Sequence, residues 1–458
     1  MNDLESLLSP GVLITDPEII ASYSRDYALY SPNGTARALV RAKTVEDVQA
    51  TMRFAHEHGI AVVPQGARTG ISGGANAVDD CILLNVSEMK RIIEINAMDA
   101  CVTVEPGIIN QELKDALRPH GLYYPPDPGS VKISSIGGNI ATNAGGLCCV
   151  KYGVTRDFVR EIKVVLADGT LTRLGRKTIK GVAGLDLCGL FVGSEGTLGV
   201  IVEATLSVIP LPEAPVTAVA TFPAIEDAAA TVAEYMGSGR SPSLMELMDG
   251  TTLSMLNDFG NFGLDDSADA MLIMQSDSPT KVDDVTAFEA VAAANNAIDA
   301  IHSDDPKDSE DLVLARRTVQ PAYEHFSRGH GDGQLLDDVC LPRSKMVEFF
   351  GRLDELRART SATISIVAHA GDGNMHPAVF FDAHDEKATA EAERVFGEIM
   401  QLGLDMGGTI TGEHGVGSLK NHWLPKELDE GARALHRGIK KAVDPQGILN
   451  PEKMLAEI

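Results

Sequence analysis

The alternation of apolar and polar positions predicts a strand–helix–strand unit at residues 38–64. The run ALVR is β-like, and Thr44 with Asp47 three residues later has the form of a capping box that starts a helix. That helix should end near His58, because Gly59 supplies a left-handed stop. The next strand, AVVP, leads directly into the glycine-rich stretch QGARTGISGGANA.

Short apolar runs continue through the first half of the chain. We expect strands near 81–85, 91–95 and 101–105, then a helix that ends at His120-Gly121. The segment EIKVVLADGTLTRL predicts a hairpin around its Asp-Gly turn. The proline-spaced PLPEAPV, which begins at Pro210, is the best candidate for a domain boundary.

Helical and β-like runs alternate in the second half, at 215–222, 226–237, 269–275 and 280–300. The acidic segment 302–312 is predicted to be a solvated loop. Two strands should flank IVAHAGDGNMHP, at 366–377, and a helix should follow at 385–402. The predicted division is therefore 1–210, 211–420 and a C-terminal return at 421–458.

Composition excludes several classes of protein. A chain of 458 residues with 44% hydrophobic and 23% charged residues is typical of a globular protein of two or three domains. A formal charge of −26 without a basic cluster excludes nucleic acid as a partner. No apolar run approaches the roughly 18 residues of a membrane span, and no leader peptide is visible, which favours the cytoplasm. The six cysteines lack CxxC spacing and are expected to be reduced.

Glycine-rich regions at 65–76, 125–153 and 193–201 are the first candidates for ligand binding. Neither a G-x-G-x-x-G nor a G-x-x-x-x-G-K-[ST] motif occurs, so nicotinamide and nucleoside-triphosphate signatures are absent. Glycines allow main-chain N–H groups to converge on an anion. The alternative is a set of irregular connections, but one large ligand touched at several points accounts better for three such regions.

The second candidate is a metal site at His369 and His376, which lie seven residues apart. If the chain folds back through AGDGNM, the two side chains become cross-strand neighbours with Cβ atoms ~5 Å apart. Two neutral imidazoles suit Zn²⁺ or Mn²⁺. The motif TGEHGVG offers Glu413 and His414 as further ligands. The alternative is two satisfied histidines near a turn and an unrelated Glu-His pair.

Three motifs carry a resemblance: PQGARTGISGG, PPDPGS…SIGGNIATNAGG…KYG and VGSEGTLGVI. They resemble the flavin-contacting segments of the vanillyl-alcohol-oxidase-type FAD family, in the branch that holds D-lactate dehydrogenase, the glycolate oxidase FAD subunit and D-2-hydroxyglutarate dehydrogenase. The resemblance implies an α+β fold, with a two-subdomain FAD-binding domain and an α/β cap that contains an antiparallel sheet. The residues it implies for FAD are Gln65, Gly66, Thr69, Gly70, Gly73, Gly74, Pro128, Ser130, Gly138, Thr142, Glu195, Gly196, Ile201 and Asn450. No histidine or cysteine at 65–76 could tether the ring, so noncovalent FAD is expected.

The metal-dependent branch of this family has motifs similar to HAGDGNMH and GEHGVG. The resemblance therefore implies that His369, His376 and Glu413 bind the metal and that His414 is the catalytic base. A carboxylate substrate on an acidic protein also needs a local cation, and arginine presents a planar fork to it. LVLARR matches the family's substrate-arginine segment, with Arg316 in that role. The alternative for Arg316 is a solvated helix position.

The expected activity is FAD- and metal-dependent oxidation of a D-2-hydroxy acid, with D-lactate as the first candidate and glycolate or D-2-hydroxyglutarate as alternatives. A metal-free oxidase, an alkyl-transfer synthase and a non-catalytic flavin electron-relay protein are the competing classes. The sequence leaves open the acceptor (quinone, electron-transfer flavoprotein or cytochrome), the choice of zinc or manganese, and the oligomeric state, a homodimer included.

Overall fold

The computed structural model describes residues 2–28, 30–260, 262–265 and 267–458. The chain divides into two compact units, and each is described by itself. The first unit comprises 1–145, 154–211 and 413–458, and the second comprises 146–153 and 212–412. The return to the first unit thus begins at Glu413 and not at 421, because Ser418 and Leu419 donate main-chain hydrogen bonds to Ser72. The short segment 146–153 joins the second unit, because Lys151 and Tyr152 bind the carboxylate of Asp277.

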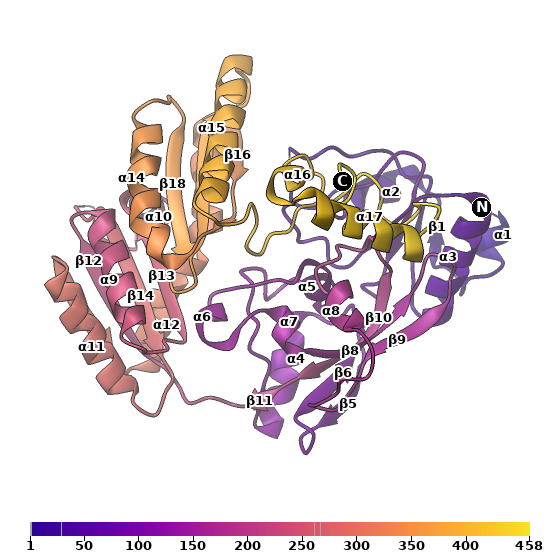
Figure 1. Ribbon diagram of the computed structural model, residues 1–458, viewed down its shortest axis with the longest axis horizontal. Helices are drawn as coiled ribbons and strands as arrows, with labels where there is room; N and C mark the ends of the chain where they lie inside the picture. Colours follow the sequence, from indigo (N-terminus) through magenta and orange to yellow (C-terminus); the bar gives the residue numbers. More distant parts are fainter. Residues whose placement is uncertain (1, 29, 261, 266) are drawn as a thin grey trace. The chain divides into compact units, whose positions relative to one another are not determined.

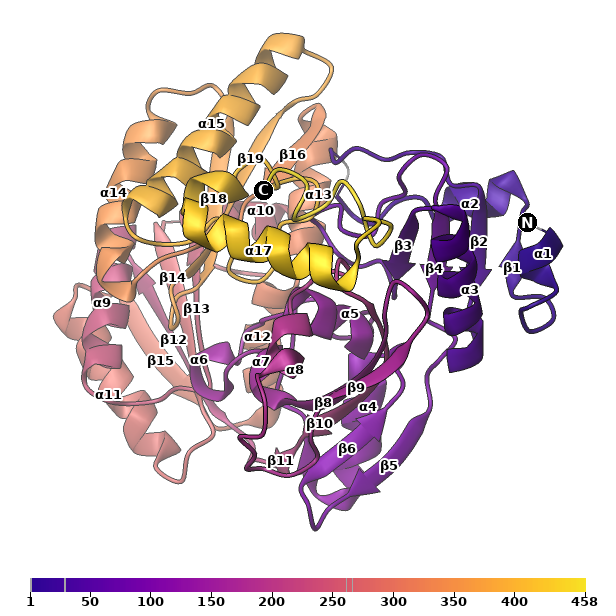
Figure 2. The same ribbon diagram turned by 45° about the vertical axis from the view of Figure 1, so that its right-hand side comes forward.

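The first unit begins with a sheet in the order β1-β2-β4-β3 (Figures 1 and 2). Strands β2, β4 and β3 are parallel, and β1 pairs antiparallel with β2. The predicted capping box is confirmed, since Thr44 accepts from the Asp47 N–H and Asp47 accepts from the Thr44 N–H. Gly59 ends helix α3 with a φ of 62°. The elements are α1 (Asn2–Glu5), β1 (Leu13–Ile14), α2 (Pro17–Ser22), β2 (Ala38–Arg41), α3 (Val45–His58), β3 (Val62–Gln65) and β4 (Ile82–Asn85).

A second, antiparallel sheet of the first unit has the order β5-β6-β10-β8-β9. The predicted hairpin is its β8–β9 pair, and a small two-stranded sheet joins β7 to β11. The elements are β5 (Ile92–Asn96), β6 (Cys101–Val104), α4 (Asn110–Leu117), β7 (Leu122–Tyr123), α5 (Ile136–Thr142), α7 (Thr155–Phe158), β8 (Val159–Val165), β9 (Leu171–Gly175), α8 (Leu187–Phe191), β10 (Val200–Ser207) and β11 (Ile209–Pro210).

The C-terminal segment of the first unit contains helices α16 (Leu424–Glu427) and α17 (Glu430–Val443) and then runs beside β3. Val62 donates its main-chain N–H to Ile448, and Asn450 donates to Val62. Ile448 and Leu449 are buried in the same core as Val62. This packing places Asn450 next to the glycine-rich loop that follows β3.

The second unit is built on one antiparallel sheet of eight strands among the described residues, in the order β15-β12-β14-β13-β18-β19-β16, with β17 also pairing β19. All strand pairs are antiparallel, which confirms the sheet expected for the cap. The strands are β12 (Val216–Phe222), β13 (Leu244–Asp249), β14 (Ala270–Ser276), β15 (Asp299–Ser303), β16 (Asp332–Leu336), β17 (Val339–Cys340), β18 (Thr363–His369) and β19 (Asn374–Asp382).

Helices cover both faces of this sheet (Figures 1 and 2). Helices α9, α11, α14 and α15 pack together on one face, and α10, α12 and α13 pack on the other. The loop predicted at 302–312 is wrong: Asp305 caps helix α12 and Pro306 is its first residue. The helices are α6 (Cys149–Tyr152), α9 (Ile225–Gly237), α10 (Gly250–Gly260), α11 (Lys281–Ala294), α12 (Pro306–Arg317), α13 (Val319–Gly329), α14 (Met346–Arg357) and α15 (Glu386–Asp405).

Candidate active site

The segments predicted to contact a flavin meet within the first unit. Ser135, the N-cap of α5, accepts from the Ala67 N–H in the loop after β3. Gly193 and Glu195 donate their main-chain N–H groups to Ile140 and Ala141 of α5. The parts of the three glycine-rich regions that belong to the first unit are therefore in direct contact, and together they form what we call the glycine surface.

Asn450 joins this surface from the C-terminal segment. Its Nδ2 donates to the main-chain oxygens of Gly74, at 3.0 Å, and Glu195, at 2.7 Å. Asn450 and Glu195 both have positive φ, at 42° and 50°, which is uncommon for residues with a Cβ. Such strain is typical of functional sites, where the surrounding contacts maintain it.

The loop after β3 has the chemistry of an anion site. Between residues 68 and 72, five consecutive main-chain N–H groups donate to no acceptor among the described residues. A Cβ on Gly66 would lie 2.5 Å from Ser135 Oγ, and one on Gly73 would lie 2.4 Å from Ser418 Oγ. A Cβ at Gly66 would therefore displace the Ser135 hydroxyl, and at Gly73 the φ of 77° also disfavours any other residue, while the unpaired donors of the loop suit a pyrophosphate. These residues therefore fit FAD.

The predicted flavin residues differ in how their side chains are used. Gln65 points inward, and its Nε2 donates to the main-chain oxygens of Tyr23 and Ala75, both at 2.8 Å. Thr142 donates to Gly138 one helical turn earlier. A flavin contact by Gln65 would therefore go through its main chain. The other residues of this prediction are placed as follows: Gly66, Thr69, Gly70, Gly73 and Gly74 after β3, Pro128 and Ser130 in the turn before α5, Gly138 within α5, Gly196 before β10, and Ile201 within β10.

The two histidines of the second unit come from the hairpin of β18 and β19. His369 pairs with Asn374, and His376 pairs with Val367, so the histidines are diagonal neighbours and not directly opposite each other. Their ring centroids are 5.0 Å apart, with an interplanar angle of 85°. The turn between the strands requires glycine at 373, where φ is 89° and a Cβ would lie 2.2 Å from the Leu341 oxygen.

Glu246 of β13 fixes the orientation of His369. The two residues are register partners, and the Nδ1 of His369 lies 2.8 and 2.9 Å from the Glu246 carboxylate oxygens. Because a carboxylate only accepts hydrogen bonds, Nδ1 carries the proton that Glu246 accepts, and Nε2 is the ring nitrogen that is not bonded to Glu246. A histidine held in this way by a carboxylate is the usual arrangement at metal centres.

Arg316 of α12 makes an ion pair with the same carboxylate, with its Nε 2.8 Å from Glu246 Oε2. Its side chain is only 11% exposed, so it is not the solvated helix residue of the alternative interpretation. Among the described residues, its two Nη groups have no hydrogen-bond or ion-pair partner. Arg317 is exposed on the same helix.

The segment 409–412 lies against the hairpin within the second unit. Thr409 and Cys340 exchange main-chain hydrogen bonds, and Gly412 donates to the main-chain oxygen of Asp338. A Cβ on Gly412 would lie 2.4 Å from Asn374 Oδ1, so Gly412 packs against Asn374. Asn374 is the residue of β19 that lies opposite His369 in the hairpin. Asp338 Oδ1 in turn lies 3.5 Å from Nδ1 of His376.

Glu413 and His414 begin the last segment of the first unit. A Cβ on Gly145 would lie 2.4 Å from Glu413 Oε2, so this carboxylate packs on the glycine-rich segment after α5. His414 Nε2 lies 3.9 Å from Glu413 Oε1.

Sequence reasoning missed Glu246 and Asp338. A detectable signal for Glu246 was a charged residue in the middle of the strand LMELMD, which is buried at every position and whose other charged residue, Asp249, stands at its end. Asp338 belongs to an Asp-Asp pair between β16 and β17, and its side chain is fully buried. Burying a carboxylate is costly unless it is paired, so a charge in a core strand marks a partner elsewhere.

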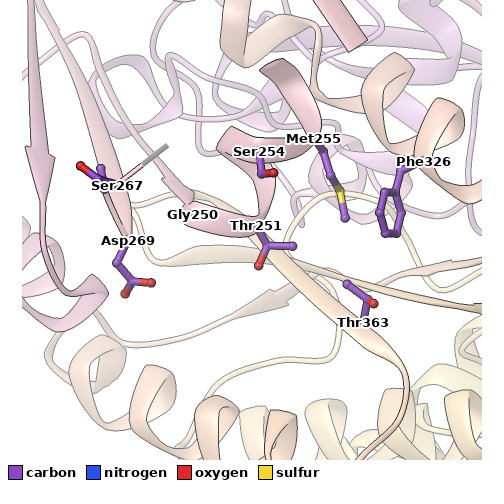
Figure 3. A pocket seen from close by; sticks show the side chains of 9 residues that line it. Gly250, Thr251, Ser254, Met255, Ser267, Asp269, Phe326 and Thr363 are labelled. Atoms are coloured by element: carbon purple, nitrogen blue, oxygen red, sulfur yellow. The ribbon is translucent and has the colours of Figure 1, made fainter. Parts of the chain in front are cut away.

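A cavity of about 530 Å³ elsewhere in the second unit is not this site (Figure 3). Thr363, which lines the cavity, is the first residue of β18, and His369 is the last. Along a strand these two residues are about 20 Å apart. Asp269 is the one charged side chain in the lining, and it accepts from the Ile225 N–H. This lining offers no cation for a carboxylate substrate.

Comparison with known proteins agrees with this geometry. The FAD binding domain family model matches residues 36–175, and the model for the C-terminal domain of FAD linked oxidases matches 211–454. The glycolate oxidase subunit GlcD of Bacillus subtilis (strain 168) is 35% identical, with 97% of this chain and 96% of the relative covered. D-lactate dehydrogenase of Anaerostipes hadrus is 32% identical (98% and 95% covered), and D-2-hydroxyglutarate dehydrogenase of Stutzerimonas stutzeri (strain A1501) is 30% identical (100% and 98%).

The fold is also that of solved flavoenzymes. A crystal structure of p-cresol methylhydroxylase with substrate bound superposes with a TM-score of 0.81 at 16% identity, covering 99% of this chain and 96% of the other. An alkyldihydroxyacetonephosphate synthase gives 0.75 at 19% identity, covering 99% and 84%.

The fold and the glycine surface define an FAD-dependent oxidoreductase of the vanillyl-alcohol-oxidase type. The chain belongs to the FAD-linked oxidases, in the branch of the D-2-hydroxy-acid dehydrogenases and glycolate oxidase subunits. Within the described residues, no helix is both long enough and apolar enough to cross a membrane.

The glycine surface predicts how FAD binding can be lost. Gly73→Ala should reduce FAD content strongly, because its φ of 77° disfavours a Cβ and the added atom would meet Ser31 and Ser418. The measurement is the ratio of flavin to protein absorbance after purification, with free FAD recovered by acid precipitation. Gly351→Ala, in α14, is the matched control, because a Cβ there meets nothing within 4 Å. Equal FAD content in both variants would contradict the assignment.

Proposed function

We propose that this protein oxidises a D-2-hydroxy acid, D-lactate first, to the 2-oxo acid with FAD and one divalent metal ion. The observation that carries the proposal is the buried Glu246–His369 pair beside His376. A carboxylate that accepts a hydrogen bond from Nδ1–H directs Nε2 to act as the ligand, and a purely structural histidine would not need this arrangement. The names of the relatives support glycolate and D-2-hydroxyglutarate as alternative substrates.

We assign the metal to His369, His376 and Glu413. Gly412 is in contact with Asn374, the partner of His369, and the next Cα along the chain is about 3.8 Å further. Chain continuity therefore supports Glu413 as the third ligand. Two imidazoles and a carboxylate suit Zn²⁺ or Mn²⁺, which when bound polarises the substrate hydroxyl as a Lewis acid.

His414 is assigned as the base that takes the hydroxyl proton, a role typically worth 10²–10⁴-fold in rate. Arg316 would hold the substrate carboxylate through its Nη groups while its Nε stays on Glu246. The residues of the glycine surface would hold FAD without a covalent bond, and FAD when bound accepts the hydride from C2. Electrons would then pass to a quinone, an electron-transfer flavoprotein or a cytochrome.

A non-catalytic electron-relay protein is the alternative from another class, and a cytoplasmic location remains a prediction. Anaerobic bleaching of the flavin by a panel of D-2-hydroxy acids distinguishes enzyme from relay. Bleaching by D-lactate ahead of glycolate and D-2-hydroxyglutarate is the result that supports the proposal.

The metal assignment predicts about one divalent ion per FAD by elemental analysis. Chelation should stop turnover and leave the yellow colour, because the flavin residues belong to the other unit. Glu246→Gln should weaken metal binding by about 10–100-fold, since it removes the carboxylate behind His369. Glu289→Gln is the control, because Glu289 also bonds a histidine, His302, but outside the site. Full activity in metal-free protein would reject the assignment.

The assignment of roles predicts different losses for neighbouring residues. His414→Asn should keep FAD and metal while the rate of flavin reduction falls by at least about 10²-fold, because only proton transfer is lost. Glu413→Gln should lower metal content and activity together. Arg316→Ala should weaken D-lactate binding, followed by perturbation of the flavin spectrum. Near-normal flavin reduction by His414→Asn would place the base elsewhere.

A further inference from the structure

Both main-chain polar groups of Glu195, its N–H and its C=O, are hydrogen-bonded within the first unit. Its N–H donates to the Ala141 oxygen at 2.8 Å, and its own oxygen accepts from Asn450 Nδ2 at 2.7 Å. It adopts a φ of 50°, which is unfavourable for a residue with a side chain. The strained backbone directs a long carboxylate side chain to one place.

That place is the glycine turn that follows His414. Oε1 of Glu195 accepts from the Val416 N–H, and Oε2 accepts from the Gly417 N–H, both at 2.7 Å. The carboxylate is buried, and burial raises the pKa of Glu195 to about 7, opposed by these two hydrogen bonds. Each oxygen thus has a short main-chain donor in a dry environment, where such bonds are strong.

The turn has little space on its other sides. A Cβ on Gly417 would lie 2.0 Å from the Ser72 oxygen, and one on Gly415 would lie 3.0 Å from Glu195 Oε1. Ser418 also donates its N–H to Ser72. The main chain at 415–418 is therefore held between Glu195 and the first glycine loop.

We propose that Glu195 is the positioning residue for the catalytic base: its carboxylate fixes the turn at 416–417, and so sets the direction of His414 two residues earlier. This inference rests on the proposed function. It replaces a flavin contact by the Glu195 side chain, since both carboxylate oxygens are already bonded to the turn. Gln at this position keeps the size but turns one acceptor into a donor that faces an N–H group.

The test is a double-mutant cycle with His414→Asn, read as the limiting rate of anaerobic flavin reduction by D-lactate at saturating Zn²⁺ or Mn²⁺. Glu195→Gln alone should retain FAD and lower this rate by about 10²-fold, the cost of a base misplaced by about 1 Å. In the His414→Asn background it should cause no further loss, because the base it positions is already absent. Glu203→Gln is the matched control, because Glu203 lies on β10 and bonds Lys163.

If the fold-losses in the rate of flavin reduction multiply in the double variant, the inference is overturned. A normal rate of flavin reduction in Glu195→Gln alone, or loss of FAD from that variant, would also overturn it. If Glu195→Gln does not fold, Glu195→Asp, which keeps the charge but shortens the reach, is read in the same cycle with the same criteria. A normal rate in His414→Asn alone would instead reject the proposed base. The failure of the inference and the failure of the proposed function are thus distinguished.

Discussion

The candidate metal site depends on one buried carboxylate, that of Glu246. It lies in the centre of an apolar strand with no exposed surface, and it is paired by Arg316 on one side and His369 on the other. An unpaired charge at this depth would cost several kcal/mol, so the carboxylate requires both partners. The same requirement orders the site, because it sets the tautomer of His369 and brings Arg316 from α12 to the sheet.

Glu413 and His414 gain their positions from the segments on either side of them. Before them, Thr409 and Gly412 are hydrogen-bonded to β17 and to Asp338 of the second unit. After them, the turn at 415–418 is bonded to Glu195 and Ser72 of the first unit. Each of the two stretches of main chain that flank these proposed functional residues is thus anchored within its own unit. Preorganisation of this kind is what a proton transfer and a metal ligand need.

The parts of the fold that can be predicted from the sequence are those determined by residues close to one another along the chain. The helix from Val45 to His58 follows from Thr44, Asp47 and Gly59, all within one short segment. The hairpin that carries His369 and His376 follows from its glycine turn, although the diagonal register depends on where the turn residues are placed. The helix at Pro306 was missed because the acidic composition of 302–312 outweighed a clear N-cap, Asp305, followed by proline.

The partners of the site residues could not be predicted in the same way. Glu246 meets His369 because β13 and β18 are neighbours in the sheet, across 123 residues of sequence. Glu195 meets Val416 across 221 residues. Such pairs follow from strand order and domain packing, which no local pattern contains. The family resemblance supplied the proposed ligands, and the structure added the carboxylates of Glu246 and Asp338, which lie beside His369 and His376.

Anomalous X-ray diffraction at the zinc and manganese edges, from crystals of the metal-loaded enzyme, tests the central claim most directly. The account predicts one peak about 2.0–2.2 Å from Nε2 of His369 and of His376, with Nδ1 of His369 still on Glu246. A metal bound through Nδ1 of His369, or no peak at the histidine pair in active enzyme, would contradict it.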